Sequence, residues 1–311
     1  MILITGSSGF IGRAVCQQLQ TRGLSFVTAV RGQGHSVSEH CLAVGEFDGC
    51  TIWSQALSGV DAVVHLAARV HIMNDQCADP LSEYRRVNVE GTRNLAMQAA
   101  SAGVKRFIFL SSIKVNGEST QPGHKYLADD LPKPSDAYAI SKHEAEQALF
   151  GIARETGMEV VIVRSPLVYG PGVKANFEKL MNAVLEGWPL PLDSVCHNRR
   201  SLVCVDNLVD FIFTCLNHPA AANQIFLVSD DEDLSTADLF HRMCASVDVP
   251  DRSWQAPVWL LRASAILLGK SGAYQRLCGS LQVDIDKSKQ LLGWTPPVSV
   301  DEGLRRAFKG Y

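Results

Sequence analysis

The sequence lacks several features that would place it in a specialised class of protein. It has no run of like charges, and its formal net charge is only −3 at pH 7, so nothing in its charge indicates nucleic acid as a partner. It has no stretch of about 18 apolar residues, which argues against a transmembrane segment. It begins with a short apolar run, without the basic region and cleavage site of a signal peptide, so we expect a cytoplasmic protein.

Regularly spaced cysteines are missing as well. The nine cysteines are scattered and odd in number, and no two of them form a Cys-x-x-Cys pair. Most lie among apolar neighbours, as Cys204 does. A disulfide framework or a structural metal site needs closer spacing, so we expect reduced, buried thiols and no bound metal.

Short apolar runs alternate with helical stretches through the first half of the chain. The runs are continuous, as expected of strands that helices cover on both faces. This alternation predicts an α/β fold of the Rossmann type, with a doubly wound parallel sheet and right-handed crossovers. The predicted strands are residues 1–5, 26–30, 62–66, 107–110 and 160–163, and the predicted helices are 10–22, 82–102 and 137–156.

The regular alternation ends at residues 165–172, which are rich in proline and glycine. We predict a dinucleotide-binding domain of residues 1–165, to which about 201–229 returns, and a smaller interleaved α/β substrate domain of 166–200 and 230–311. The helix predicted at 257–269 is largely apolar; we expect it to be buried, and the alternative is contact with a membrane surface. The other predicted elements are helices 175–186, 206–217 and 235–246 and strands 201–205 and 225–228.

A glycine-rich turn joins the first predicted strand to the first predicted helix. The spacing Gly6-x-x-Gly9-x-x-Gly12 lets the backbone turn tightly and approach a pyrophosphate, while the helix N-terminus offers free N–H groups. Its position in a strand–turn–helix context at the chain start is what such a motif requires. We therefore predict that a dinucleotide contacts Gly6, Ser8, Gly9, Phe10, Ile11 and Gly12.

The end of the second strand bears on the choice between NAD and NADP. An acidic residue there would bind the ribose hydroxyl of NAD, but no carboxylate occurs before Glu39. Arg31 follows the strand instead and could pair with the 2′-phosphate of NADP, helped by Arg13 or His35. This pattern favours NADP (NADPH) and leaves NAD possible.

Two segments of the first half carry groups suited to proton transfer. Tyr138 and Lys142 are four residues apart and lie on one face of the predicted helix. Ser111 and Ser112 end a buried strand, and the carboxyl edge of an open α/β sheet is where ligands bind. An ammonium beside a phenol, together with an oxidised nicotinamide ring, would lower the phenol pKa from about 10.

The sequence contains six motifs, given at the end of this paragraph, in the order typical of the extended short-chain dehydrogenase/reductases. It resembles in particular the nucleotide-sugar enzymes similar to UDP-galactose 4-epimerase. The resemblance covers nearly the whole chain and implies an enzyme with a nucleotide-sugar substrate. It implies that Ser112 is the catalytic serine, that Tyr138 is the acid/base and that Lys142 lowers its pKa and holds the ribose. The motifs are Gly6-x-x-Gly9-x-x-Gly12, His65-Leu66-Ala67-Ala68, Asn88-Val89-x-Gly91-Thr92, Leu110-Ser111-Ser112, Tyr138-x-x-x-Lys142 and Val168-Tyr169-Gly170-Pro171.

The resemblance also implies further binding residues. Ser112 and Tyr138 would contact the substrate, and Asn88 would flank the site, although it could instead bond local backbone. Cofactor contacts are expected at Glu46 and Phe47, or at Asp48, and at Leu66, Ala67 and Ala68. Sugar-diphosphate contacts are expected at Asn176, Arg200 and Arg276, of which the arginines could alternatively be surface charges.

Two departures from the family pattern concern the sugar. Asn116 stands where a tyrosine is usual, and Leu167 stands where epimerases often have an asparagine. Both positions are expected to lie near the sugar, so the usual hexose preference does not carry over. The acid pair of 4,6-dehydratases is also missing, because Ile113 and Lys114 follow Ser112.

Three functions fit these residues. The first is an NADPH-dependent 4-ketosugar reductase; the chain resembles bacterial polysaccharide-cluster enzymes, which implies a substrate of the UDP-N-acetylhexosamine type and a role in polysaccharide precursor synthesis. The second is a UDP-sugar 4-epimerase with tightly bound NAD, and the third is a non-catalytic module that senses NADP. In this family, helices corresponding to 82–102 and 137–156 form a dimer interface, which implies a homodimer.

Overall fold

The computed structural model describes residues 1–32, 41–70, 79–267 and 271–309. Seven parallel strands form one sheet in the order β3-β2-β1-β4-β5-β6-β9. This order confirms the predicted Rossmann-type α/β fold. The order of the strands in the sheet reverses between β1 and β4. The strands are β1 (Ile2–Thr5), β2 (Phe26–Val30), β3 (Cys41–Ala43), β4 (Ala62–His65), β5 (Arg106–Ser112), β6 (Glu159–Ser165) and β9 (Gln224–Leu227).

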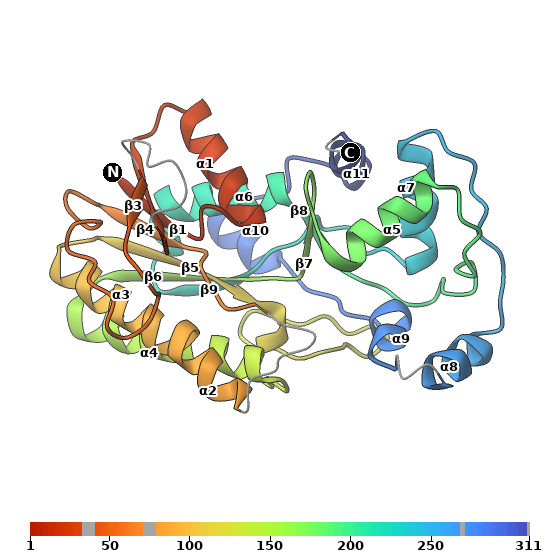
Figure 1. Ribbon diagram of the computed structural model, residues 1–311, viewed down its shortest axis with the longest axis horizontal. Helices are drawn as coiled ribbons and strands as arrows, with labels where there is room; N and C mark the ends of the chain where they lie inside the picture. The colour runs from red at the N-terminus through yellow and green to blue at the C-terminus, as the bar shows by residue number, and fades with distance from the viewer. Residues whose placement is uncertain (33–40, 71–78, 268–270, 310–311) are drawn as a thin grey trace.

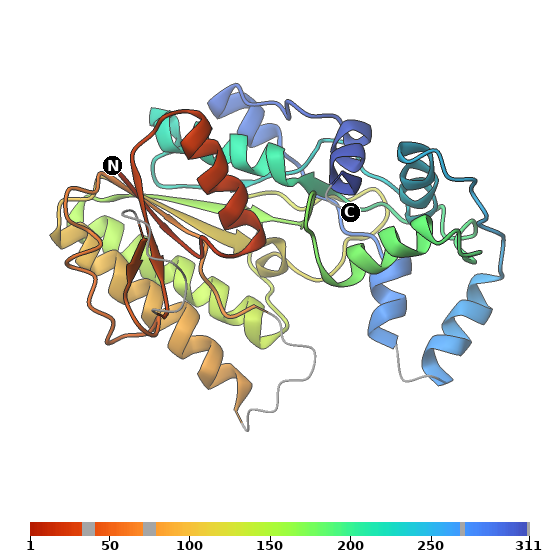
Figure 2. The ribbon, with the colours of Figure 1, turned by 45° about the horizontal axis from the view of Figure 1, so that its top comes forward.

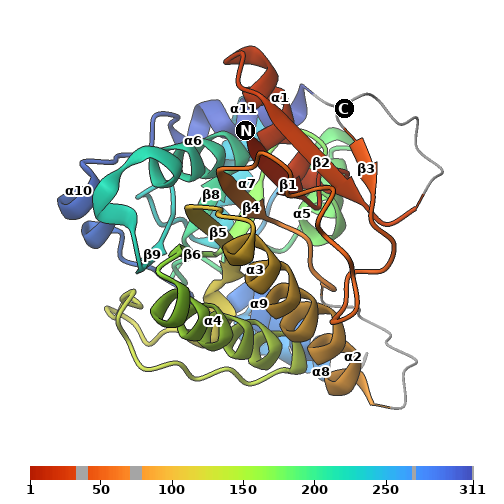
Figure 3. The same cartoon turned by 90° about the vertical axis from the view of Figure 1, so that its left-hand side faces the viewer.

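Helices cover both faces of this sheet, as Figure 3 shows. Successive strand residues point to opposite faces, so Leu3 packs with α3 and α4 while Ile4 packs with α1 and α6. One layer contains α1 (Phe10–Thr21), α6 (Val205–Asn217) and α10 (Asp286–Leu292), and the other contains α2 (Pro80–Tyr84), a π-helical turn (Arg85–Glu90), α3 (Gly91–Ser101) and α4 (Ala137–Thr156).

A second group of elements lies beyond the carboxyl ends of the strands, on the right in Figure 1. The short strands β7 (Leu167–Tyr169) and β8 (Leu202–Cys204) pair in parallel, and a separate hydrophobic cluster lies between the elements around them. The residue limits of the two predicted domains stay a prediction. The helices of this group are α5 (Ala175–Leu185), α7 (Thr236–Ser246), α8 (Val258–Leu267), α9 (Ser271–Cys278) and α11 (Val300–Phe308).

Helix α8 corrects one expectation. The sequence predicted a buried apolar helix, yet Trp259, Leu260 and Leu267 are exposed, and α8 lies at one end of the molecule beside α9 (Figure 2). Within the described ranges no helix has the length and apolarity needed to cross a membrane. The cysteines of the same ranges are all free thiols, as expected; Cys204, Cys215 and Cys244 are buried, whereas Cys50 is exposed, which corrects the expectation of burial for that residue.

Candidate active site

The glycine turn between β1 and α1 is packed too tightly for side chains at two positions. Gly6 has a left-handed φ of 72°, and a Cβ atom there would lie 2.7 Å from the backbone nitrogen of Ala67. A Cβ atom on Gly12 would lie 2.1 Å from the carbonyl oxygen of Gly6. The turn is therefore packed directly against the loop after β4 and the start of α1, the close backbone packing that glycines allow in a dinucleotide-binding turn.

A buried hydrogen-bond chain fixes this turn to the neighbouring strand. Thr5 Oγ1 lies 2.6 Å from His65 Nδ1 and accepts from the backbone N–H of Ala67 at 3.2 Å. His65 Nε2 lies 2.9 Å from Thr92 Oγ1. Burial, with a smaller effect of Lys142, lowers the pKa of His65 to about 3, so the ring is neutral. The motif around His65 was visible in the sequence, but this structural role of its ring was not.

The predicted acid/base residues meet at the carboxyl end of β5. Ser112 is the last residue of β5, and Tyr138 lies in the first turn of α4, close enough for the Ser112 hydroxyl to act against the rise in the phenol pKa. Lys142 follows one helical turn later; its Nζ donates to the carbonyl oxygen of Leu110 at 2.8 Å and lies 4.2 Å from the centre of the Phe109 ring. The structure thus brings Ser112, Tyr138 and Lys142 to one edge of the sheet.

The start of α4 is what places Tyr138. Asp136 is the N-cap, and its Oδ1 accepts from the backbone N–H of Ala139 at 2.7 Å. Its Oδ2 lies 2.6 Å from Nζ of Lys114, which also reaches Glu118 at 3.1 Å. Asp136 therefore fixes both the first turn of the helix and the loop that follows Ser112.

Burial dominates the electrostatics of this site. It raises the pKa of Tyr138, with added effects of Asp136 and Tyr84, while the hydrogen bond from Ser112 acts in the opposite direction. Burial also lowers the pKa of Lys142 to about 7, against the attraction of Glu146. The protein alone therefore raises the pKa of the Tyr138 phenol. The lowered pKa that the sequence led us to expect stays a prediction for the protein with bound dinucleotide.

A buried ion pair lies directly behind the catalytic edge. Arg164 donates to Glu146 at 2.6 and 3.0 Å, and Ser111 donates to the same carboxylate at 2.5 Å. Arg164 also donates to the side-chain oxygen of Asn116 at 3.0 Å, and the Asn116 amide donates to Leu127 at 2.9 Å. The Asn116 side chain belongs to this buried network, and the expectation that position 116 lies near the sugar stays a prediction. No local sequence signal revealed this pairing.

Two of the predicted diphosphate residues lie near one another. Burial and the nearby Arg276 both lower the pKa of Arg200, whose Nη1 donates to Gly279 at 3.1 Å. The backbone of Arg200 bridges Leu234 and Leu281. Neither arginine takes part in an ion pair with a carboxylate among the residues described. Guanidinium groups near enough to influence each other's charge are suited to an anion with paired oxygens.

The remaining substrate candidates are placed less distinctively. Asn176 is exposed in the first turn of α5, and Leu167 is exposed on β7. Asn88 is buried; it bonds the backbone of Arg69 in both directions, at 2.8 and 3.1 Å, and donates to Ser141 Oγ at 3.0 Å. Asn88 therefore connects the loop after β4 to α4; the backbone that it bonds is not local, and its place beside the site stays a prediction.

The predicted cofactor residues outside the glycine turn lie at the ends of β2 and β4. Arg31 is exposed directly after β2, whereas His35 and Glu39 lie outside the described residues. Leu66, Ala67 and Ala68 follow β4 and are partly buried.

The adenine candidates occupy the loop after β3. Glu46 is exposed, while Phe47 is buried with its ring 5.1 Å from that of Trp53. Asp48 forms an ion pair with Arg86 at 3.3 Å. The Phe47 side chain therefore belongs to the core, so only its backbone is available to a base.

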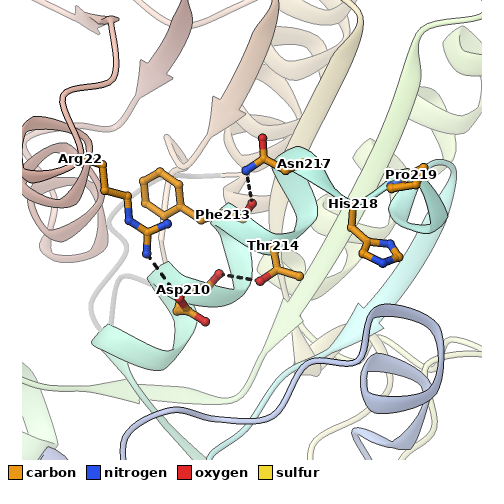
Figure 4. A pocket seen from close by; sticks show the side chains of 7 residues that line it. All are labelled: Arg22, Asp210, Phe213, Thr214, Asn217, His218 and Pro219. Atoms are coloured by element: carbon orange, nitrogen blue, oxygen red, sulfur yellow. Dashed lines mark hydrogen bonds and ion pairs between the residues drawn. The ribbon is translucent and has the colours of Figure 1, made fainter.

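A shallow pocket lies at the other edge of the sheet (Figure 4). Arg22 and Phe213 line it; the guanidinium of Arg22 lies 4.2 Å from the Phe213 ring centre and forms an ion pair with Asp210 at 3.4 Å. His218 also lines it, and its backbone oxygen accepts a hydrogen bond from Arg106. Arg106 is at the amino end of β5, and Ser112 is at the carboxyl end. The pocket is therefore separate from the predicted catalytic edge.

The structure has a Rossmann-type fold, and one edge of its sheet carries the serine, tyrosine and lysine expected of an extended short-chain dehydrogenase/reductase. The sequence matches the NAD dependent epimerase/dehydratase family over residues 2–229, and the chain belongs to that family. It is similar to a UDP-glucose 4-epimerase of Vibrio cholerae, with 46% identity over 311 residues, covering 100% of this chain and 95% of the relative.

Solved structures support the same fold. A UDP-glucuronic acid 4-epimerase from Bacillus cereus in complex with NAD is 21% identical, with a TM-score of 0.77, and the match covers 99% of this chain and 97% of that one. A UDP-glucose 4-epimerase from Thermotoga maritima with UDP-glucose is 22% identical, also with a TM-score of 0.77 and with coverage of 99% and 97%. The chain is therefore an enzyme of a family that binds NAD(P) and acts on nucleotide sugars.

Proposed function

We propose that the enzyme transfers a hydride at C4 of a UDP-sugar. The observation that carries this proposal is the convergence of Ser112 at the end of β5 with Tyr138 and Lys142 in the first turns of α4, where Lys142 donates to Leu110 of the same strand. Arg200 and Arg276, whose charges influence each other, are the cationic groups proposed to hold the nucleotide diphosphate.

The proposed roles follow from the chemistry of each side chain. The bound nicotinamide ring accepts or supplies the hydride. Ser112 donates a hydrogen bond to the C4 oxygen, and Tyr138 removes the hydroxyl proton in oxidation or returns it to the carbonyl in reduction. Lys142 holds the ribose and, when charged, favours the phenolate of Tyr138. The glycine turn at Gly6 and Gly12 holds the pyrophosphate.

Two reactions share this half-reaction. In 4-epimerisation, the ketosugar would rotate within the site and receive the hydride on its opposite face. The cofactor would then return to its original oxidation state and stay bound. This reaction is supported by the Vibrio cholerae relative and by the NAD named with the Bacillus cereus structure. In 4-ketosugar reduction, for example of a UDP-N-acetylhexosamine derivative, NADPH is consumed. The exposed Arg31 after β2 is the observation that favours this second candidate; the NAD named in the solved relatives does not support it.

The cofactor that purifies with the protein separates the two reactions. Denaturation of the purified enzyme should release stoichiometric NAD if it is an epimerase, and the intact enzyme should then interconvert UDP-glucose and UDP-galactose without added nicotinamide. Cofactor-free protein that oxidises NADPH only when a UDP-4-ketosugar is present would identify the reductase. Protein that binds neither dinucleotide would contradict both.

Replacing one phenol tests the proposed acid/base. We expect Tyr138→Phe to lower kcat by about 10²–10⁴-fold, because general acid–base catalysis contributes about that much, with little change in dinucleotide affinity. Tyr126→Phe is the matched control, since the Tyr126 hydroxyl donates to the backbone oxygen of Ser119. Equal activity in both variants would remove Tyr138 from the mechanism.

We further propose that the enzyme is a homodimer through the exposed faces of α3 and α4. Met97 on α3 is exposed, which provides an apolar group for such a contact. Light scattering of the purified protein measures this directly, and a monomer of 33.9 kDa would contradict it.

A further inference from the structure

The five tryptophans divide into two sharply different groups. Trp53 and Trp294 are 1% and 5% exposed and pack in the core. Trp188, Trp254 and Trp259 are 57%, 50% and 68% exposed. Tryptophan has a large apolar body and a polar N–H, so exposing three of them is costly unless that surface has a partner.

The exposed tryptophans belong to neighbouring segments. Trp188 follows α5, and Trp254 precedes α8. The backbone N–H of Trp254 donates to Leu190 at 3.0 Å, and Arg252 donates to the carbonyl oxygen of Gly187 at 3.5 Å. These bonds bring the two segments together at the end of the molecule that carries α8 (Figures 1 and 2).

Helix α8 extends this surface with aliphatic side chains. Leu260 and Ile266 are exposed, and Leu267 is 87% exposed. Burial of aliphatic side chains stabilises a folded chain, and this chain does not gain that contribution at these positions. We call the whole surface the tryptophan patch; it consists of Trp188, Trp254, Trp259, Leu260, Ile266 and Leu267.

The stretch between Asp251 and Asp284, which contains Trp254 and α8, has charges of one sign, whereas Glu186 lies two residues before Trp188. Between Asp251 and Asp284 the sequence has no acidic residue, and Arg252 and Arg276 are exposed at its two ends. The charged residues of this stretch are Arg252, Arg262, Lys270 and Arg276. Exposed tryptophan and leucine side chains can insert at the surface of a bilayer, and nearby basic side chains are attracted to anionic lipids. The segment that contains α8 carries both kinds of side chain.

We propose that the tryptophan patch binds the surface of an anionic lipid bilayer, with α8 lying in the plane of the headgroups. Tryptophan rings are suited to the boundary between headgroups and acyl chains, and arginine heads pair with lipid phosphates. A second copy of the chain is a poorer occupant, because a two-fold contact would place the basic segment opposite itself. The proposal does not depend on which sugar reaction the enzyme performs.

Vesicle flotation with the full-length enzyme tests this proposal. We expect the protein to float with vesicles of phosphatidylglycerol and phosphatidylcholine, and much less with phosphatidylcholine alone. Binding should weaken as salt is raised, since the electrostatic part is screened. Tryptophan fluorescence should shift to shorter wavelength on binding, because exposed rings enter a less polar environment. Failure to float with the anionic vesicles would overturn the proposal.

A pair of variants locates the contact. Trp254→Ser/Trp259→Ser/Leu267→Ser should lower the partition coefficient by about tenfold or more, a loss of at least about 1.4 kcal/mol. Ile52→Ser, at a residue 77% exposed on a different part of the chain, should bind like the parent. The single variant Leu267→Ser gives the same test with the smallest change to the fold. Equal flotation of all variants, or self-association of the parent that the triple variant abolishes without any vesicle binding, would contradict the proposed partner.

Discussion

The ammonium of Lys114 lies 2.6 Å from Oδ2 of Asp136, and Asp136 is two residues before Tyr138. Asp136 raises the pKa of Tyr138, so the positive charge of Lys114 offsets part of that effect. Lys114 also bonds Glu118 at 3.1 Å. Lys114 is thus a positioning residue that affects the proposed catalytic phenol through Asp136.

Lys114→Met should therefore change the pH dependence of the reaction. Without the ammonium, the charge of Asp136 is uncompensated and the pKa of Tyr138 rises further. The phenolate needed for oxidation becomes rarer, so the acidic limb of the kcat profile should move to higher pH and the rate at pH 7 should fall. Lys114→Arg should retain the parent profile.

A matched control is available in the same region of the chain. Lys133 is exposed, and its backbone N–H donates to Val115. Lys133→Met should leave the pH profile unchanged. An unchanged profile in Lys114→Met as well would refute the proposed coupling, whatever its effect on stability.

Gly12→Ala should impair dinucleotide binding. The new Cβ would lie 2.1 Å from the Gly6 oxygen and 2.7 Å from Ser7 Cα, and both are backbone atoms that cannot move independently. An overlap of this kind costs about 1–3 kcal/mol, so we expect dinucleotide affinity to fall about tenfold or more and Tm to fall as well.

Gly151→Ala is the control for this substitution. Gly151 lies within α4, where a Cβ atom would have nothing within 4 Å. Alanine is the better helix former by about 1 kcal/mol, so this variant should be as stable as the parent or more stable. Calorimetry with and without dinucleotide measures both effects, and normal binding by Gly12→Ala would show that the turn does not form the cradle.

The sequence was sufficient to predict the elements that local signals define. The limits of α4 match the predicted helix 137–156, because Asp136 caps its N-terminus and Gly157 ends it with a left-handed φ of 76°. Strands of the large sheet were predictable because they are continuous apolar runs buried on both faces. The three-residue strand β3 (Cys41–Ala43) was missed, since so short an edge strand has no distinctive pattern.

Features that depend on distant contacts were not predictable. Ser111 and Ser112 are identical neighbours, yet alternation along β5 directs Ser111 to Glu146 and Ser112 to Tyr138. The motif order suggested this division, but the buried partner of Ser111 comes from α4. The exposure of α8 was also missed, because composition alone does not distinguish an apolar helix in a core from one on a surface.

Arg276→Gln should weaken substrate binding more than turnover. Arg276 lies close enough to Arg200 to lower its pKa, so we expect both to hold the diphosphate. Loss of one charged hydrogen bond costs about 1.5–3 kcal/mol, which corresponds to an increase in KM of about 10–100-fold with a smaller change in kcat. Arg305→Gln on α11, where Arg305 pairs with Glu302, should leave KM unchanged. Equal KM values in the two variants would exclude Arg276 from the substrate site.

Glu146→Gln should destabilise the fold strongly at neutral pH. It removes the charge that compensates buried Arg164, and breaking a buried pair costs about 3–5 kcal/mol. Glu144→Gln is the matched control on the same helix: Glu144 pairs with exposed Arg85, and surface pairs contribute at most about 1 kcal/mol. Urea denaturation of the three proteins gives the free energies of unfolding.

The pH dependence of these free energies distinguishes a lost charge from a packing defect. His143, Arg164 and Ser111 together hold the pKa of Glu146 below its ordinary value of 4.5, despite burial. A carboxylate with a lowered pKa stabilises the fold fully above its unfolded-state pKa and loses that contribution as the pH falls through the folded value. The difference between parent and Glu146→Gln should therefore be largest at pH 7 and shrink below pH 4.5, because the protonated parent resembles the variant. A difference that stays constant on acidification would mean that the substituted amide disturbs packing and that the ion pair is not the cause.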